Sequence, residues 1–274
     1  MISALLSVYA GDNSRYLDAC LASIWDWQER RPDEIVIVQD GPVPLPLREI
    51  LAKWRDRLGP AVARILVHDE NRGLGESLRT GLRHCEGDLV ARIDADDLAL
   101  PSRLLLQERF LTGHPEVDIL GGAARLIDEE GRFLGVRRMP VDHQEIRQRI
   151  WSCPLIHPSV MFRKQAIISV GSYDGQLARR QEDYELWIRA ARSRLVFHNL
   201  PDELIAYRVP ENAGRKNGID VGWNRILIGW SAVREFDPRP YAYVALAYPL
   251  IRALLPGFLS RVLQKRVAGL DPRS

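Results

Sequence analysis

Residues 34–41 read Glu34-Ile35-Val36-Ile37-Val38-Gln39-Asp40-Gly41. A near-continuous run of β-branched side chains is typical of a strand that is buried on both faces, as in a parallel sheet. Gly41 then predicts a turn, because glycine adopts backbone conformations that other residues avoid. The stretch therefore predicts a buried parallel strand whose last residues lie at the carboxyl end, beyond which ligands bind in such sheets.

The flanking sequence repeats this pattern, with helices between the strands. We predict strands at 2–9, 63–68 and 89–93 from short apolar runs. Helical spacing predicts helices at 16–25, with Asn13 or Ser14 as the N-cap, and at 45–58 and 75–85. Because strands and helices alternate across short turns, residues 1 to about 100 predict an α/β fold with a Rossmann-type, mostly parallel sheet flanked by helices.

The second half of the chain is less regular. Helices are predicted at 101–114, 143–150 and 182–193, and extended segments at 117–127 and 159–162. After residue 218 the pattern predicts two further helices, joined near Asp237-Pro238. The length suits one large domain with a helical appendage.

Composition and charge exclude several classes of protein. The 274 residues carry 38 Lys and Arg against 36 Asp and Glu, a net charge of +2, so the chain has no general attraction for nucleic acid. We find no apolar stretch of about 20 residues that would span a membrane, and residues 1–10 lack the basic flank of a signal peptide. Cys20, Cys85 and Cys153 are widely spaced and predict reduced, buried thiols in a cytoplasmic protein.

Polar residues follow each of the four predicted strands in the first half. Tyr9 follows the first strand, Asp40 the second, Asn71-Arg72 the third and Asp94-Ala95-Asp96-Asp97 the fourth. The carboxyl ends of parallel strands meet at one edge of a sheet, so these side chains are expected to surround one crevice.

The acidic run has two interpretations. It could be a solvated turn whose last aspartate begins a helix. Three carboxylates so close together also repel one another and need a positive partner. Since Asp94-Ala95-Asp96-Asp97 directly follows an apolar strand, we favour a site for Mg²⁺ or Mn²⁺, which take oxygen ligands and share them with phosphates.

The remaining polar motifs also allow structural alternatives. Asp40-Gly41 could be a simple turn, and Asn71-Arg72-Gly73-Leu74-Gly75 a plain helix entry whose spacing does not fit a dinucleotide fingerprint. The acids of Gln181–Trp187 suit a helix start, although an acid beside a crevice could also act as a general base. His157 lies near Cys153, but a zinc site would need more ligands.

Together these motifs resemble family 2 of the inverting glycosyltransferases, which has the GT-A fold. The likeness extends from Leu6 to about Arg208 and depends on the order and spacing of the motifs. These are Ser7-Val8-Tyr9, Asp33 to Gly41, Asn71 to Gly75, Ile93 to Asp97, His157-Pro158-Ser159 and Glu182 to Trp187.

The resemblance implies a role for each matching residue. Those implied to hold the nucleotide are Ser7, Tyr9, Asp40, Asn71, Arg72, Asp94, Ala95 and Asp96. Asp96 and Asp97 would bind a divalent metal, Mn²⁺ or Mg²⁺, at the donor diphosphate. Asp183 matches the general base, with Glu182 beside it, and His157 would lie on the acceptor side.

The resemblance also implies an activity and a division of the chain. We expect a single sugar to pass, with inversion, from a nucleotide-sugar donor such as a UDP-sugar to the hydroxyl of a glycan or lipid-linked acceptor, in the synthesis of bacterial surface polysaccharide. A GT-A domain would cover 1–215, with a nucleotide-binding half (1–100) and an acceptor-side half (101–215), and 216–274 would form a helical extension. The Gln-x-x-Arg-Trp motif of processive synthases is missing, and Gln39 stands where many members have an acid.

Two alternative functions are kept. A sugar-phosphate nucleotidyltransferase usually has a Gly-rich, cationic loop after the first strand, whereas Ala10-Gly11-Asp12-Asn13 has no cation. A catalytically silent subunit that binds a nucleotide or glycan is the other, and the retained Asp94, Asp96 and Asp183 argue against it.

The C-terminal segment suggests contact with a membrane surface. Residues 241–259 are rich in apolar and tyrosine side chains, and Arg261, Lys265 and Arg266 follow. Arg252 and two prolines oppose a membrane span. We therefore expect peripheral attachment to the inner leaflet of the plasma membrane; the alternative is that these helices pack over the catalytic domain.

Overall fold

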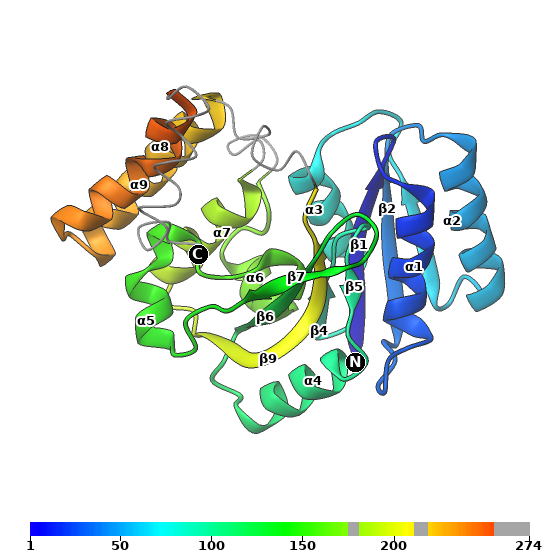
Figure 1. Ribbon diagram of the computed structural model, residues 1–274. Helices are drawn as coiled ribbons and strands as arrows, with labels where there is room; N and C mark the ends of the chain where they lie inside the picture. Colours follow the sequence, from blue (N-terminus) through cyan, green and yellow to red (C-terminus); the bar gives the residue numbers. More distant parts are fainter. Residues whose placement is uncertain (175–180, 211–218, 255–274) are drawn as a thin grey trace.

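Four parallel strands form the core of the first hundred residues. The computed structural model describes residues 1–174, 181–210 and 219–254. The strands β1 (Ile2–Tyr9), β2 (Glu34–Asp40), β3 (Ala63–Val67) and β4 (Leu89–Arg92) lie in the order β3-β2-β1-β4. Their connecting helices are α1 (Ser14–Trp25), α2 (Leu45–Leu58) and α3 (Leu74–His84). Figure 1 shows β1 and β2 side by side. The predicted βαβ units are therefore confirmed.

The side chains of β2 explain why its sequence is a continuous apolar run. Ile35 and Ile37 pack in a cluster with residues of α1 and α2 on one face of the sheet. Val36 points the other way and joins a cluster with Leu78 and Leu82 of α3. Because both faces are covered by helices, the positions from Ile35 to Val38 favour apolar residues, and polar residues stand only at the two ends of the strand.

The second half extends this sheet with mixed pairing. The strand β8 (Met161–Arg163) pairs antiparallel with β4, and β6 (Ile119–Ile127), β9 (Phe197–Arg208) and β5 (Leu98–Ala99) follow in that order. The strands β6 and β9 are parallel, whereas β7 (Phe133–Arg137) pairs antiparallel with β6. The parallel arrangement is thus concentrated in the first half, as expected for an α/β fold whose second half builds on one edge of the sheet.

In its described residues between 103 and 192, the second half of the chain also contains four helices and two short 3₁₀ turns. They are α4 (Arg103–Gly113), α5 (His143–Gln148), α6 (Lys164–Ser169) and α7 (Glu182–Arg192), with 3₁₀ turns at Ile150–Ser152 and His157–Ser159. The predicted extended segment at 159–162 therefore begins later, at Met161. The sequence did not predict α6, β5, β7 or β9.

Two C-terminal helices form a hairpin beside α7. They are α8 (Ile219–Phe236) and α9 (Pro240–Leu254), and they confirm the two helices predicted around Asp237 (Figure 1). Ala232 of α8 and Leu246 of α9 are buried in the same cluster as Trp151 and Tyr184. None of the helices in the described ranges is long and apolar enough to cross a membrane. The basic residues after 254 on which the membrane expectation also depends lie outside the described residues.

Candidate active site

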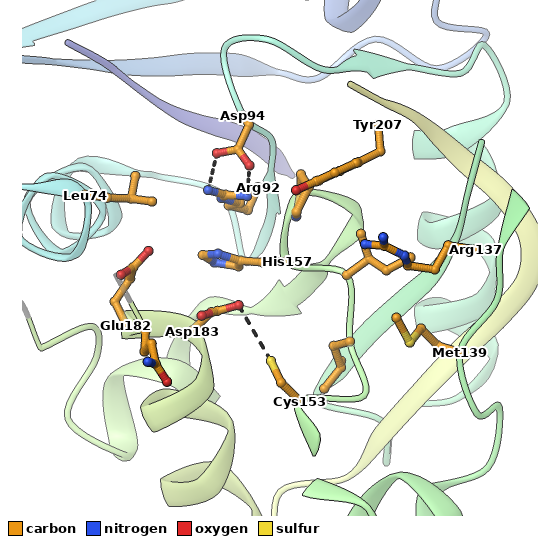
Figure 2. Close-up of a pocket in the computed structure, with 14 residues that line it drawn as sticks. Leu74, Arg92, Asp94, Arg137, Met139, Cys153, His157, Glu182, Asp183 and Tyr207 are labelled. Carbon is orange, nitrogen blue, oxygen red and sulfur yellow. Dashed lines mark hydrogen bonds and ion pairs between the residues drawn. The ribbon is translucent and has the colours of Figure 1, made fainter. Parts of the chain in front are cut away.

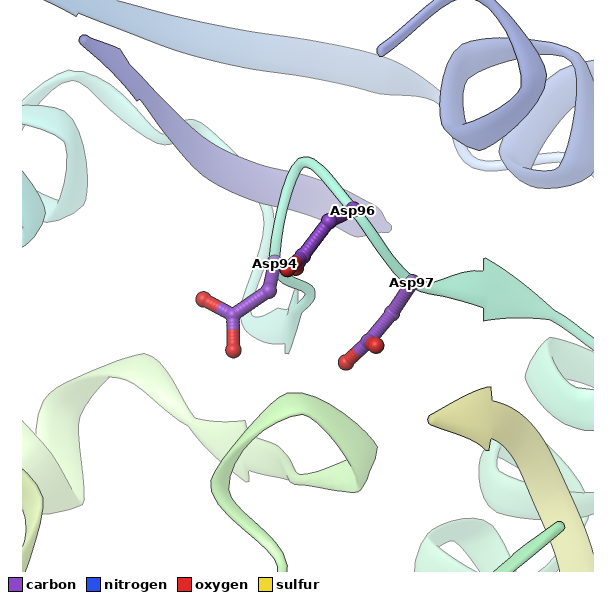
Figure 3. A group of neighbouring side chains, drawn as sticks. All are labelled: Asp94, Asp96 and Asp97. Carbon is purple, nitrogen blue, oxygen red and sulfur yellow. The ribbon is translucent and has the colours of Figure 1, made fainter. Parts of the chain in front are cut away.

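Three aspartates converge in the loop that follows β4. Carboxylate oxygens of Asp94, Asp96 and Asp97 lie within 4.8 Å of one another (Figure 3). The loop is a tight turn, in which the Asp97 backbone N–H donates to the Asp94 carbonyl at 3.2 Å. The neighbouring Ile93 N–H donates to the Leu5 carbonyl at 3.1 Å, so the loop is fixed to the central strand β1.

The charges of this cluster are poorly compensated. Burial, and then the repulsion from Asp94, raises the pKa of Asp96 to about 6. Burial, and then the charges of Asp94 and Asp96, raises the pKa of Asp97 well above its usual range. One oxygen of Asp97, Oδ1, accepts from the Arg208 backbone N–H at 2.8 Å, while the buried Oδ2 has no hydrogen-bond partner among the described residues. An unpartnered carboxylate oxygen beside two further carboxylates fits a divalent cation.

Arg92 orients the first of the three aspartates. Both terminal nitrogens of its guanidinium bond the Asp94 carboxylate, with an Nη1–Oδ2 distance of 2.9 Å. Burial lowers the pKa of Arg92, but nearby acids, Asp94 first among them, offset this and leave it raised. No role for Arg92 was predicted from the sequence, although an arginine inside an apolar strand next to an acidic run is a signal for such a pair.

Arg208, at the end of β9, fixes the acidic loop from the other side. Its side chain donates through Nε to the Asp96 carbonyl at 3.0 Å and through Nη1 to the Asp128 carbonyl at 2.9 Å. The guanidinium also lies over the Tyr16 ring, 4.0 Å from the centroid. Arg208 therefore connects the loop to the turn between β6 and β7 and to α1.

The residues that the resemblance assigns to the nucleotide lie at the carboxyl ends of β1 and β2 and in the loop after β3. Tyr9 is exposed and opposes the buried Asp40 in the strand register. Asp40 accepts hydrogen bonds from the backbone N–H groups of Arg72 and Gly73 at 2.8 and 2.9 Å. This carboxylate thereby holds the Asn71-Arg72 loop, whose side chains are exposed. Direct contact of Asp40 with a base stays a prediction.

Ser7 and Ala95 lie closer to the interior. Ser7 is half-buried on β1, opposite Val38 of β2, and Ala95 is buried between two of the aspartates. Their proposed part in nucleotide binding stays a prediction, as do the roles of Tyr9, Asn71 and Arg72.

One cavity brings the remaining site residues together. It has a volume of about 240 Å³ and is lined by Leu74, Arg92, Asp94, Arg137, Met139, Cys153, Leu155, Ile156, His157, Pro158, Gln181, Glu182, Asp183 and Tyr207. Figure 2 shows Asp94 on one side and Asp183 on the other, with His157 between them. Asp96, Asp97 and the residues at the ends of β1 and β2 do not line this cavity.

Glu182 and Asp183 begin α7 and face the cavity. Burial, and then the adjacent Asp183 charge, raises the pKa of Glu182 to about 7. The Asp183 carboxylate contacts the Cys153 thiol, with an Oδ2–Sγ distance of 3.7 Å. Glu182 is therefore mostly protonated below neutral pH. Position in the first turn suits both acids, since the helix dipole favours negative charge there.

His157 lines the cavity between Asp94 on one side and Asp183 on the other (Figure 2). Its Nε2 lies 2.9 Å from the Tyr173 hydroxyl, and its ring packs edge-to-face with Trp187 at 5.8 Å. Burial, and then the nearby Arg92, lowers the pKa of His157 well below its usual range. His157 is therefore neutral near pH 7 and belongs to the wall of the cavity; its place on the acceptor side stays a prediction.

Comparison with known proteins gives a consistent set of relatives. Residues 3–187 match the family model described as Glycosyl transferase family 2. The amylovoran biosynthesis glycosyltransferase AmsE of Erwinia amylovora is 37% identical over 227 residues, which cover 82% of each chain. An Escherichia coli UDP-Gal:alpha-D-GlcNAc-diphosphoundecaprenol beta-1,3-galactosyltransferase is 30% identical over 79% of this chain and 78% of its own.

Solved structures share the fold at lower identity. Staphylococcus aureus TarS 1-349 in complex with UDP-GlcNAc superposes with a TM-score of 0.65 at 17% identity, covering 92% of this chain and 72% of its own. The Pyrobaculum calidifontis mannosyltransferase PcManGT, in complex with GDP-Man and Mn²⁺, gives a TM-score of 0.65 at 16% identity, over 98% and 79% of the two chains.

Proposed function

The chain belongs to glycosyl transferase family 2, and on that basis we propose that it transfers one sugar, with inversion, from a UDP-sugar to an acceptor hydroxyl. The observation that carries this proposal is that Asp94, which belongs to the acidic triad, and Asp183 line one cavity from opposite sides. Inversion requires a single displacement, with a base on the acceptor side and charge stabilisation on the donor side.

The acids of α7 and the acidic triad would have separate parts in this reaction. Asp183 would accept the proton of the acceptor hydroxyl, and the Cys153 contact orients its carboxylate. Glu182 is less suited as the base because its raised pKa keeps it mostly protonated below about pH 7. Asp96 and Asp97, with Asp94, would hold Mn²⁺ or Mg²⁺, which when bound neutralises charge on the departing diphosphate. Arg92 and Arg208 keep this loop in place.

The names of the relatives suggest the acceptor. One relative acts in amylovoran biosynthesis, and another on a sugar carried by diphosphoundecaprenol. We therefore propose a glycan or lipid-linked acceptor, and a role in bacterial surface polysaccharide synthesis. The nucleotidyltransferase alternative is disfavoured by the family match over residues 3–187. A silent binding subunit would differ from an enzyme in giving no hydrolysis of any nucleotide sugar.

We also propose contact with the inner face of the plasma membrane. Ile219, Trp223, Leu227 and Trp230 are each more than half exposed and recur every three or four residues along α8. They therefore lie on one outer face of the hairpin. Tryptophan is favoured where a helix meets the polar boundary of a bilayer. This surface supports peripheral attachment. It is a second reason for the proposal, beside the basic residues that follow position 254 in the sequence.

Replacement of the proposed base tests the function directly. We expect Asp183→Asn to lower kcat by about 10²–10⁴-fold, the usual loss of a general base, while the affinity for UDP in the presence of Mn²⁺ stays unchanged. The assay follows release of UDP from a panel of UDP-sugars with polyprenyl-diphosphate glycans as acceptors. The control is Asp202→Asn, which alters an exposed acid in the middle of β9 that does not line the cavity. More than about a tenth of wild-type kcat in Asp183→Asn would remove Asp183 from this role.

A further inference from the structure

Arg137 is a cation of the cavity that the proposed reaction has not used. It lies at the end of β7, where it pairs with Ala124 of β6, while Tyr207 of β9 pairs with Leu126. Since residues 124 and 126 point to the same face of β6, their partners do so too. The Arg137 guanidinium lies over the Tyr207 ring, 5.6 Å from the centroid. Both side chains line the cavity on the side away from Leu74 and Glu182 (Figure 2).

The partners of the two cavity arginines differ. Arg92 is buried and bonded to Asp94 through both terminal nitrogens. The Arg137 residue is half-buried, and its guanidinium forms no ion pair or hydrogen bond with any residue in the part of the chain that the structure describes. Its neighbour Arg138, in contrast, is exposed and donates to the Pro201 carbonyl at 3.0 Å. A guanidinium has five donors and is costly to desolvate, so its unused donors suit an anionic ligand.

The hydroxyl of Tyr207 is a second donor at this place. Burial, and then the Asp97 and Asp94 charges, raises the pKa of Tyr207 to about 12, so the hydroxyl keeps its proton. The lining of the same cavity also includes three apolar side chains, Met139, Leu155 and Ile156. Two donors on an apolar wall are suited to a phosphate that continues into an apolar chain.

The acids that share the cavity with Arg137 indicate whether the phosphate belongs to the donor or to the acceptor. The donor diphosphate is assigned to the acidic triad, which lies in the loop after β4. Arg137 shares the cavity with Asp183, the proposed base, and the group next to a base is the acceptor. An anionic acceptor entering beside Asp94, Glu182 and Asp183 would be repelled unless a cation received its charge.

From this placement we propose that Arg137 and Tyr207 form a subsite for the phosphate of a diphosphate-linked acceptor. The inference rests on the proposed transfer reaction and narrows its acceptor to one in which a phosphate lies next to the receiving sugar. Arg137 would bind the phosphate through its planar fork, and Tyr207 would hold the guanidinium in position and donate one further hydrogen bond.

A binding experiment separates this subsite from the donor site. The protein is saturated with UDP and Mn²⁺, and calorimetry then follows the binding of hexyl diphosphate and of hexyl glucoside, which has the same chain but no phosphate. We expect Arg137→Gln to weaken hexyl diphosphate by about tenfold or more, the usual effect of losing a hydrogen bond to a charged group. Arg137→Lys should recover part of this loss, and hexyl glucoside should be unaffected.

Arg138→Gln is the matched control, because it removes the same charge from the adjacent residue outside the cavity. If the wild type, Arg137→Gln and Arg138→Gln bound hexyl diphosphate with equal affinity, the proposed subsite would be refuted. Weaker UDP binding in Arg137→Gln would assign Arg137 to the donor and would overturn it as well. Neither result depends on catalysis, whereas failure to hydrolyse or transfer from any nucleotide sugar would refute the proposed function instead.

Discussion

Asp97 presents one hydrogen-bonded oxygen and one unpartnered oxygen to the acidic loop, which gives the proposed metal site a specific test. We expect wild-type protein to bind UDP more tightly with Mn²⁺ than with EDTA. In Asp96→Ala this difference should disappear, since loss of even an outer partner of a metal ligand typically lowers affinity by about 10–100-fold.

The Asp96→Ala variant should remain folded. Its side chain is partly exposed, and its removal relieves the repulsion that contributes to the raised pKa of Asp97. Calorimetry with UDP gives the affinities, and thermal unfolding in EDTA checks the fold. Equal UDP affinity of the wild type in Mn²⁺ and in EDTA would contradict the metal site.

Glu182 makes stability depend on pH in a defined direction. Its pKa is raised from 4.5 to about 7, first by burial and then by Asp183. Between these values the folded state binds more protons than the unfolded chain, so the free energy of unfolding falls as the pH rises. The contribution is fully present below about pH 4.5 and lost above about pH 7, with a size of at most about 3 kcal/mol.

Glu182→Gln isolates this contribution. Urea unfolding in EDTA at pH 5 and pH 7.5 should show a smaller decrease in stability for Glu182→Gln than for the wild type. Asp12 and Asp96, with pKa values raised to about 7 and about 6, act in the same direction in both proteins and cancel in the comparison. Identical decreases would show that Glu182 is ionised in the folded protein across this range.

At the scale of elements, α3 packs unusually close to the sheet. A Cβ added at Gly81 would lie 2.3 Å from Leu5 Cδ1 and 3.0 Å from Val38 Cγ2. Alanine is the better helix former by about 1 kcal/mol, but the overlap with the fully buried Leu5 requires the leucine side chain or the helix to shift within a packed core. We therefore expect Gly81→Ala to destabilise the protein by about 1–3 kcal/mol in urea unfolding.

Gly113→Ala provides the comparison for this variant. Gly113 ends α4, and a Cβ there would meet no atom within 4 Å. Its substitution should be neutral or slightly stabilising. If both variants had the same stability, close packing of α3 would not decide the spacing of helix and sheet.

The strands that the sequence predicted and those that it missed differ in the regularity of their apolar pattern. The central strands β1 and β2 are covered on both faces, so their residues form continuous apolar runs. In contrast, β7 is partly to fully exposed, and β9 contains Pro201-Asp202 near a register shift against β6. Neither strand has the regular alternation from which a strand is inferred.

The site residues also divide into those that the sequence pattern predicts and those that only the pairing of strands brings together. The aspartates were found because they directly follow a predicted strand. Arg137 and Tyr207 lie far apart in sequence and meet only because β7 and β9 flank β6. Arg208 is likewise placed at the acidic loop by β9. One sequence does not reveal which strands are neighbours in the second half, so these contacts required the structure.

In the whole molecule, the C-terminal hairpin has an inner and an outer face with different properties. The inner face carries Ala232 and Leu246 into the core with Tyr184, and a Cβ at Gly229 would lie only 2.1 Å from the Tyr184 hydroxyl oxygen. Packing over the catalytic domain and attachment to a membrane are therefore compatible. The division into a domain over 1–215 and an extension over 216–274 stays a proposal.

The outer face allows membrane attachment to be tested without disturbing the core. Ending the chain at Asp237 would remove Leu246 from the core, so surface substitutions are the better probe. Trp223 and Leu227 are 54% and 59% exposed, and their replacement together by serine removes apolar area that a bilayer would otherwise bury. We expect the wild type to float with anionic liposomes at low salt, less so at high salt, and the double variant to float much less.

Leu45→Ser is the matched control, because Leu45 is 57% exposed and lies at the start of α2, in the first half of the chain. Its flotation should equal that of the wild type, since an exposed leucine alone does not make a membrane surface. If the wild type stayed at the bottom of the gradient at low salt, the hairpin would serve packing alone. If the double variant and Leu45→Ser floated as well as the wild type, attachment would involve a surface other than the outer face of α8.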